Sequence, residues 1–465
     1  MNKAISIILV FLVFVFLFVS CNGDGSVDEA FNCTITFDGN GATSEEQAQQ
    51  RVGKGIGIDL KGNMFIRDGF GFLWWNTEAD GSGESYFNGQ HICFDEDLTL
   101  YAQWGILISE DTTALTDGNI YTLNRSVEVA ERLTVTGNVS LILPDGYRLT
   151  AQKGISVNEG NSLTIDSLGS GTGELTAIAS DDNTFDAAIG GEEGFSSGLI
   201  TLYGGNVTAT YGGSFGAAIG GGRNGSGTVS IYGGNVWATY EGTYGAAIGG
   251  GDKGSGTVTI YGGNVTVTNK SRFGAAIGGG RNSSGTVTIF DGNVTVVYSD
   301  GHAAAIGGGA GGNGTVTING GNVTATSMEY GATIGGGSDG NGTVTINGGT
   351  VTATGEFDAP GIGVGYTGSG GSLTINGGMV IATGGDYGAG IGGSYTGSGI
   401  DVTINGGTVL AIGGEDEAAG IGRGRGGAND GTLTLGEGVA LEVSSDNENW
   451  SDFDGTTRKR YMRTK

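Results

Sequence analysis

Ring side chains recur at one fixed place in the second half of the sequence. Each lies four residues before an isoleucine that itself recurs about every 29 residues. The set is Phe215, Tyr244, Phe273, His302, Tyr330 and Tyr387, with Phe185 at the same place one repeat earlier. Such rings can stack on one another and stiffen a corner of the fold, or they can stack on the sugar rings of a polysaccharide. Both interpretations are open, and His302 is interpreted as a member of the column rather than as a catalyst.

Carboxylates lie beside these rings in several repeats. They are Asp181, Asp182, Glu241, Asp300, Glu329, Glu356, Asp358, Asp386, Glu415, Asp416 and Glu417. Carboxylates at one edge of consecutive coils could share Ca²⁺. Their offset from the isoleucine is not constant, however, and the calcium-binding pattern G-G-x-G-x-D is not followed. A solvated acidic edge is therefore the favoured interpretation, with Ca²⁺ as an alternative and no metal site assigned.

Threonines recur in Thr-x-Thr pairs on the predicted strands. The pairs are Thr257 and Thr259, Thr286 and Thr288, Thr315 and Thr317, and Thr343 and Thr345. The strand preference of β-branched residues explains them on a solvated face. A minor alternative is a flat array that orders water or ice, because the pairs resemble those of β-solenoid antifreeze proteins in this feature alone.

Catalytic motifs are weak or missing in the sequence. Only two histidines occur, no Ser-His-Asp grouping stands out, and no phosphate-binding G-K-S/T loop is present. Regular repeats produce many equal sites rather than one special site, so no catalytic residue and no cofactor are expected. The enzyme alternative is a β-helix polysaccharide lyase or glycosidase. It would require a cleft of Asp, Glu and Arg that breaks the regularity, for instance near residues 358–360.

The elements that position these residues follow from the repeat. Its isoleucines are Ile189, Ile219, Ile248, Ile277, Ile306, Ile334, Ile362, Ile391 and Ile421, at steps of 28 to 30 residues. A fixed period of this length indicates stacked units, none of which buries its apolar face alone. Alternation within one coil predicts that Ala217, Ile219, Val229, Ile231, Val236 and Ala238 face inward. The sequence therefore predicts an all-β fold whose main part is a slim right-handed parallel β-helix with about nine regular coils over 186–440.

Short alternating runs over 106–185 predict irregular N-terminal coils that cap this solenoid. The tail 441–465 ends in a basic stretch, for which a loose end and a contact with the acidic solenoid are both open. The composition has 100 glycines but only 2 prolines, with no three-residue period, which excludes collagen. The net charge of −27 excludes nucleic acid as a partner.

The N-terminus predicts an exported protein. Residues 1–20 form a signal peptide, with Lys3 before an apolar run that is too short to span a membrane comfortably. Phe18-Val19-Ser20-Cys21 resembles a bacterial lipobox, which implies lipid on Cys21 and a membrane anchor. Residues 21–30 then form a tether. An ordinary signal peptide with a stray cysteine is the alternative.

Residues 31–105 predict a separate module. T-F-D-x-N-G, G-F-x-F-x-x-W-N-T-x-x-D-G-S-G and D-x-T-L-Y-A-Q-W resemble the Listeria–Bacteroides repeat over about 33–104. That resemblance implies a small β-grasp-like module on a cell envelope, where it serves as a spacer or adhesive element. Export makes a disulfide between Cys33 and Cys93 an open possibility.

The repeat array also carries a family resemblance. G-T-V-T-I-N-G-G-T-V-T-A-T (342–354) resembles Gly-rich β-helix lipoproteins of the carbohydrate-binding kind. We therefore expect a lipid-anchored protein of the cell envelope, on the outer membrane or cell surface, that acts as a non-catalytic adhesin or polysaccharide-binding scaffold. Its partner would be an extracellular polysaccharide or a host or matrix protein. A passive structural stalk is the further alternative.

Overall fold

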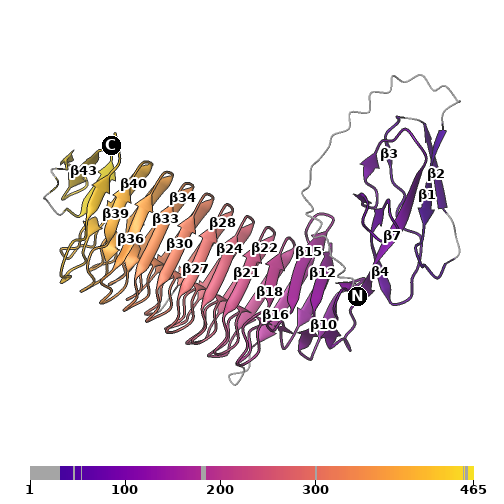
Figure 1. The fold of residues 1–465 in the computed structure, drawn as a ribbon, viewed down its shortest axis with the longest axis horizontal. Coiled ribbons are helices and arrows are strands. Elements are labelled where there is room, and N and C mark those ends of the chain that lie inside the picture. Colours follow the sequence, from indigo (N-terminus) through magenta and orange to yellow (C-terminus); the bar gives the residue numbers. More distant parts are fainter. Residues whose placement is uncertain are drawn as a thin grey trace, which may run out of the picture. The chain divides into compact units, whose positions relative to one another are not determined.

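The computed structural model describes residues 32–44, 48–53, 55–179, 185–298, 301–453, 455 and 459–465. The chain divides into two compact units, of which the first ends at Trp104 and the second comprises Gly105–Lys465 (Figure 1). Strands and turns build both units, and the described residues contain no helix. The predicted all-β fold, a small module followed by a parallel β-solenoid, is confirmed.

The first unit is a mixed β-sheet with a parallel pair at its centre. In sheet order its strands are β2 (Ala48–Gly53), β1 (Asn32–Asp38), β7 (Leu98–Leu107), β4 (Phe70–Asn76) and β5 (Ser85–Tyr86). β1 runs antiparallel to β2 and parallel to β7, which is the central pairing expected of a β-grasp-like sheet. A separate antiparallel pair is formed by β3 (Ile58–Asp59) and β6 (His91–Ile92).

Aromatic side chains fill the core of this unit. The ring of Trp75 is buried, with its centroid 4.7 Å from that of Phe37 and 4.9 Å from that of Phe72. Trp104 is half-buried and donates a hydrogen bond from Nε1 to the Gly39 carbonyl oxygen at 3.0 Å. Both tryptophans therefore hold the module together rather than bind a ligand.

The predicted disulfide between Cys33 and Cys93 does not form. Cys33 is a buried free thiol. It lies on β1 in the large sheet, whereas Cys93 directly follows β6 in the separate two-stranded sheet. The two residues therefore belong to different sheets, a separation that proximity in the sequence alone does not reveal.

The second unit is a solenoid of three parallel sheets, to each of which every coil except that of β41 and β42 contributes one strand (Figure 1). The first sheet has 12 strands in the described chain, and nine of them begin at the repeat isoleucines. These strands are β8 (Ala114–Leu115), β11 (Leu133–Val135), β14 (Ile155–Ser156), β17 (Ile189–Gly190), β20 (Ile219–Gly220), β23 (Ile248–Gly249), β26 (Ile277–Gly278), β29 (Ile306–Gly307), β32 (Ile334–Gly335), β35 (Ile362–Val364), β38 (Ile391–Gly393) and β41 (Ile421–Gly422).

The second and third sheets follow the same order along the axis. The second contains β9 (Ile120–Thr122), β12 (Asn138–Pro144), β15 (Ser162–Leu168), β18 (Leu199–Leu202), β21 (Gly227–Ile231), β24 (Gly256–Ile260), β27 (Gly285–Ile289), β30 (Gly314–Ile318), β33 (Gly342–Ile346), β36 (Gly371–Ile375), β39 (Asp401–Ile404) and β42 (Leu433–Leu435). The third contains β10 (Val127–Val129), β13 (Arg148–Ala151), β16 (Glu174–Ala179), β19 (Asn206–Tyr211), β22 (Asn235–Tyr240), β25 (Asn264–Asn269), β28 (Asn293–Tyr298), β31 (Asn322–Ser327), β34 (Thr350–Gly355), β37 (Met379–Thr383) and β40 (Thr408–Ile412).

The interior of the solenoid matches the predicted alternation. The inward set of the coil at Ile219 is buried, namely Ala217, Ile219, Val229, Ile231, Val236 and Ala238. Identical residues pair in register from coil to coil, as Ile231 does with Ile260 and Ile260 with Ile289. Such pairing aligns apolar columns at the strand spacing of about 4.8 Å. The core is therefore one continuous stack of Ile, Val and Ala.

Glycine is required where neighbouring coils come closest. Gly220 and Gly249 have φ angles of 139° and 134°. A Cβ on Gly220 would lie 1.9 Å from the Gly249 carbonyl oxygen, and one on Gly249 would lie 2.0 Å from that of Gly278. No other residue fits such a position, because both the conformation and the space exclude a side chain.

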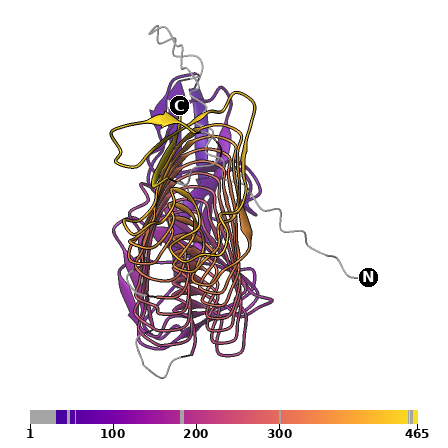
Figure 2. The same ribbon diagram turned by 90° about the vertical axis from the view of Figure 1, so that its left-hand side faces the viewer.

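The C-terminal tail covers the last coil. β45 (Tyr461–Thr464) pairs antiparallel with β40 and with β43 (Leu441–Ser444), and β43 also pairs with β44 (Ser451–Asp452). Met462 and Val443 are buried against the solenoid core. Viewed from this end, the C-terminal strands lie across the stacked coils (Figure 2). The described part of the tail is thus a cap that removes an open strand edge.

Candidate functional site

The predicted ring side chains form a stack along one edge of the solenoid. We call Phe185, Phe215, Tyr244, Phe273, His302 and Tyr330 the ring column. Successive ring centroids are 5.2, 5.2, 5.6, 5.5 and 4.6 Å apart. The first pair is tilted by 44°, and the others lie within 8° to 24° of parallel. All six side chains are half-buried, so the column is a continuous stack with one side toward solvent.

Tyr387 does not continue this stack, in contrast to the prediction. Asp358 occupies the ring position of the intervening coil. The next ring beyond Tyr330 is Tyr366, with a centroid distance of 5.5 Å and an edge-on angle of 75°. Tyr387 instead lies edge-on to Tyr395 at 5.5 Å. The column therefore ends at Tyr330, because one carboxylate replaces a ring.

The stacking decides which part of each ring is available to a ligand. A ring inside the column has a neighbour on both faces, so what it turns toward solvent is its edge. Sugar stacking requires a free ring face, whereas a ring edge carries the positive part of the aromatic quadrupole. The interior of the ring column is therefore suited to electron-rich groups rather than to the face of a sugar.

Buried tyrosines hold the loops that carry the ring column. The Gly216 amide donates a hydrogen bond to the Tyr211 hydroxyl at 2.7 Å, and the Gly245 amide donates one to the Tyr240 hydroxyl at 2.8 Å. The Tyr240 hydroxyl in turn donates to the Ser214 carbonyl at 3.1 Å. Burial raises the pKa of Tyr211 to about 12. The alternation that places Val236 and Ala238 inside places Tyr240 there too, a signal that the sequence analysis overlooked.

Arginines from the glycine turns lie over the rings. The Arg281 guanidinium is 4.0 Å from the Tyr244 ring centroid, and that of Arg223 is 4.7 Å from the Phe215 centroid. Arg281 is fixed by two hydrogen bonds to Asp252, from Nε to Oδ1 at 2.8 Å and from Nη2 to Oδ2 at 3.0 Å. Asp252 is 1% exposed, so a buried carboxylate fixes the orientation of the Arg281 guanidinium.

A second axial file runs along the corner after the second sheet. Tyr203, Tyr232, Tyr261 and Phe290 stack at 4.6, 4.3 and 5.0 Å. A ladder of amide side chains then continues the file, because Asn347, Asn376 and Asn405 each donate a hydrogen bond from Nδ2 to Oδ1 of the preceding Asn at 2.8 Å. A parallel ladder that the sequence analysis did not single out links Asn206, Asn235 and Asn264.

Threonines face outward on two of the sheets, as the alternation predicts. Thr257, Thr286, Thr315 and Thr343 are exposed, and their partners at Thr259, Thr288, Thr317 and Thr345 are half-buried. On the third sheet Trp237 stands between Thr208 and Thr266, its register partners on the neighbouring coils, and is 40% exposed. The outer faces of these sheets are therefore largely polar, with Trp237, Leu199, Val297 and Met379 as exposed apolar side chains.

The acidic edge is partly outside the described residues, because Asp181, Asp182 and Asp300 are not among them. Burial raises the pKa of Asp358, and the negative charges of Glu329 and Asp386 raise it further. Within the described ranges, no group of three or more His, Cys, Asp or Glu side chains is arranged to hold a metal ion. The predicted Ca²⁺ alternative thus has no site assigned to it.

A concavity of about 350 Å³ lies in the last coils, where the ring column has ended. Glu356, Asp386 and Glu415 line it on successive coils, together with Phe357 and Arg460. Arg460 contacts Glu415 at 3.4 Å and donates from Nε to the Gly413 carbonyl oxygen at 3.0 Å. Residues 358–360, where the enzyme alternative looked for a cleft, do not line this concavity, and β34, β37 and β40 beside it stay paired in register.

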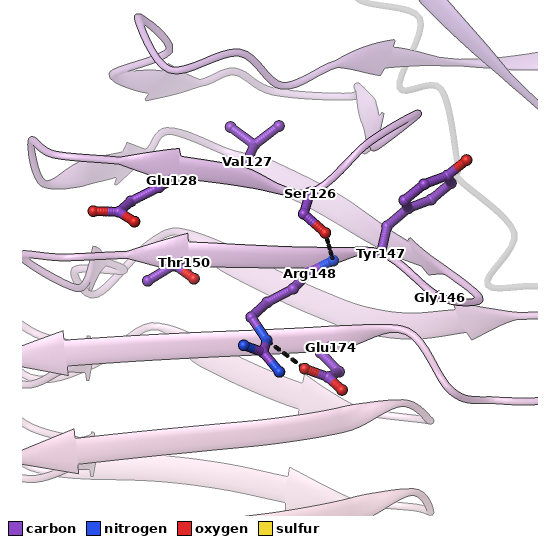
Figure 3. Close-up of a pocket in the computed structure, with 8 residues that line it drawn as sticks. All are labelled: Ser126, Val127, Glu128, Gly146, Tyr147, Arg148, Thr150 and Glu174. Atoms are coloured by element: carbon purple, nitrogen blue, oxygen red, sulfur yellow. Dashed lines mark hydrogen bonds and ion pairs between the residues drawn. The ribbon is translucent and has the colours of Figure 1, made fainter.

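A second concavity of about 520 Å³ lies on the irregular N-terminal coils (Figure 3). Its lining comes from β10, β13, β16 and the turn before β13. Arg148 pairs with Glu174, and its backbone amide donates to the Ser126 hydroxyl at 3.1 Å. Tyr147 extends from the turn (Figure 3) and is 37% exposed. The site is polar and open, and the Arg148 guanidinium, the only one that lines it, is paired with the Glu174 carboxylate.

The predicted lipidation residue, Cys21, and the predicted signal peptide (1–20) lie outside the described residues. The described residues include no helix of the length and apolar character that crossing a membrane requires.

Comparison with known proteins supports both halves of the architecture. Residues 34–103 match the Listeria–Bacteroides repeat domain family. The β-helix repeat family matches at residues 200–223, 229–252, 258–281, 316–338, 344–366, 373–395 and 402–422. A 45-residue segment is 47% identical to a protein of Evansella cellulosilytica that is named as a Gly-rich membrane protein, and it covers 10% of this chain but only 5% of that protein. No solved structure matches the chain. The chain thus carries a Listeria–Bacteroides repeat domain at 34–103, followed by β-helix repeats between residues 200 and 422.

Proposed function

We propose that the protein is a non-catalytic scaffold of the bacterial cell envelope whose solenoid binds an extended polysaccharide. The supporting observation is the identical presentation of side chains on consecutive coils. The ring column and the amide ladders repeat one side chain per coil over several coils. A polymer of repeating units gains from such a surface, because each further contact is intramolecular once the first has formed.

Two further features support a place in the cell envelope. A Listeria–Bacteroides repeat domain precedes the solenoid, and a short segment is similar to a Gly-rich membrane protein. We propose that Cys21 carries the lipid that anchors the chain. Cys21→Ala should release the protein from membranes into the soluble fraction, whereas unchanged retention in washed membranes would contradict the anchor.

The experiment that tests binding is a glycan array probed with the purified full-length chain, with and without Ca²⁺. Specific signal on polymeric glycans, with weaker signal on the matching oligosaccharides, would support the scaffold. A blank array would contradict polysaccharide binding and favour a protein partner or a passive stalk. The rings are half-buried, which is compatible with a binding surface and with a passive stalk. The glycan array distinguishes these two functions.

A polysaccharide lyase or glycosidase is the second candidate, because of the concavity lined by Glu356, Asp386, Glu415 and Arg460. Carboxylates on both sides of a bound sugar are the usual requirement for glycoside hydrolysis. Incubation with bound polysaccharide should then release reducing ends or unsaturated products, and Asp386→Asn should abolish their release. Intact polymer after long incubation would contradict this candidate.

A further inference from the structure

Charge is divided unevenly along the solenoid. Residues 282–422 contain no Lys or Arg and carry eleven carboxylates. Residues 212–281 instead carry five basic residues, Arg223, Lys253, Lys270, Arg272 and Arg281, against Glu241 and Asp252. Although the whole chain has a net charge of −27, the three coils at Ile219, Ile248 and Ile277 are therefore locally positive.

Three of the five basic side chains, those of Arg223, Arg272 and Arg281, lie over rings of the column. Arg223 and Arg281 lie over the rings of Phe215 and Tyr244, and the Arg272 guanidinium is 5.4 Å from the Phe273 centroid. Lys253 lies in the glycine turn of the coil between those of Arg223 and Arg281, and its backbone amide donates a hydrogen bond to the Arg281 carbonyl oxygen at 3.1 Å. We call Arg223, Lys253, Arg272 and Arg281, with the rings of Phe215, Tyr244 and Phe273, the basic ring edge.

Two of these cations are available to a ligand. Ion pairs within the described residues join Arg223 to Glu193, Lys270 to Glu241 and Arg281 to Asp252, and none of them includes Lys253 or Arg272. Lys253 and Arg272 are both exposed. The Asp252 carboxylate accepts hydrogen bonds from Nε and Nη2 of Arg281, and Nη1 takes no part in that ion pair.

The ring edges, like the basic side chains, favour a negatively charged ligand. Because they stack on one another, they present edges with positive partial charge to solvent. Guanidinium and ammonium groups bind carboxylates and sulfates through charge-assisted hydrogen bonds. Cations on coils spaced by about 4.8 Å can bind successive groups of one chain. Between Arg281 and Arg423 the only fully charged side chains are carboxylates, so the coils of this stretch would repel an anionic polymer.

We propose that the basic ring edge binds the carboxylate or sulfate groups of an anionic polysaccharide, at the coils between Ile219 and Ile277. This proposal rests on the proposed function and names the ligand class and the part of the solenoid that takes it. The polymer binds by ionic contacts along the ring edges, not by stacking on ring faces.

The test compares three probes, namely polygalacturonate, its fully methyl-esterified form and dextran, against the full-length chain in a chelator. Wild type should bind polygalacturonate with an affinity that falls steeply with salt, and bind the ester and dextran much more weakly. Lys253→Glu with Arg272→Glu should weaken polygalacturonate binding by about tenfold or more. The milder pair Lys253→Gln with Arg272→Gln should weaken it less, and it serves if the reversed charges disturb folding.

The matched control is Arg51→Glu with Lys61→Glu, which changes the net charge equally in the first unit. Its binding should stay within about twofold of wild type. Equal loss in the control would overturn the site, because binding would then follow total charge. Equal binding of dextran, or unchanged binding by the charge-reversed pair, would overturn the inference while polysaccharide binding stands. The same probes are then tested with Ca²⁺ in place of the chelator. Binding of polygalacturonate only with Ca²⁺ would overturn the inference and move the site to the acidic edge. No binding of any probe under either condition would reject the proposed function itself.

Discussion

Single polar side chains decide how the ring column is held and where it ends. Tyr211 and Tyr240 fix the ring loops from inside through their hydroxyls. Asp358 ends the column by taking a ring position. The two faces of each loop therefore differ in role. On the inner face a tyrosine hydroxyl accepts a hydrogen bond from a backbone amide, and on the outer face a ring of the column contacts solvent.

Removing the Tyr240 hydroxyl should destabilise the protein by about 1–3 kcal/mol, since it leaves the Gly245 amide and the Ser214 carbonyl without their buried partner. Thermal unfolding of Tyr240→Phe measures this. Tyr244→Phe is the control, because among the described residues no hydrogen bond engages the Tyr244 hydroxyl. Equal melting temperatures for the two variants would contradict the positioning role of Tyr240.

Asp358→Asn should stabilise the protein at neutral pH. Burial and the charges of Glu329 and Asp386 raise the pKa of Asp358, so the folded state binds its proton more tightly than the unfolded state. Ionised Asp358 therefore destabilises the fold at neutral pH, and wild type gains stability as the pH falls through this raised pKa. The advantage of the variant, measured by chemical unfolding, should shrink over the same range. A pH-independent difference would show that charge at Asp358 is not the cause.

At the scale of the element, the in-register pairing of strands from coil to coil stabilises the solenoid. Inward apolar residues pair in register with those of both neighbouring coils, so a change at one inward position acts on the coils on both sides. Outward positions on the same strand lack this coupling, because their side chains meet solvent.

Ile231→Asp should unfold the neighbouring coils, since an unpaired buried carboxylate costs several kcal/mol. Thr257→Asp, at an exposed position on β24, should leave the melting temperature nearly unchanged. Circular dichroism during heating compares them. A folded Ile231→Asp protein with unchanged melting would mean that the inward assignment of β21 is wrong.

Gly249→Ala should destabilise by more than about 2 kcal/mol, because the new Cβ would overlap the Gly278 carbonyl oxygen. Gly438→Ala is the matched control, at a φ of 78° with open space around it. It should cost only about 1 kcal/mol, the penalty of the left-handed conformation. Similar losses in chemical unfolding would show that coil-to-coil contact does not select glycine at position 249.

At the scale of the whole molecule, the repeat made the architecture predictable, because a 29-residue period with inward Ile and Val leaves few alternatives to a stacked coil. The free state of the Cys33 thiol was not predictable. The sequence does not show that Cys33 lies on β1 of the large sheet while Cys93 follows β6 of the two-stranded sheet. The exposed part of each ring was not predictable either. Periodicity places Phe215 and Tyr244 in one column, but only their near-parallel stacking shows that edges, not faces, meet solvent.

The most direct test of the non-catalytic binding scaffold measures binding and polymer length in the same sample. The full-length chain is mixed with a panel of neutral and anionic polysaccharides, bound protein is measured by co-sedimentation, and the polymer is then sized by gel filtration. The account predicts saturable binding to at least one polymer whose length is unchanged after long incubation. Shortened polymer would show an enzyme, and no binding across the panel would show that the solenoid does not bind polysaccharide.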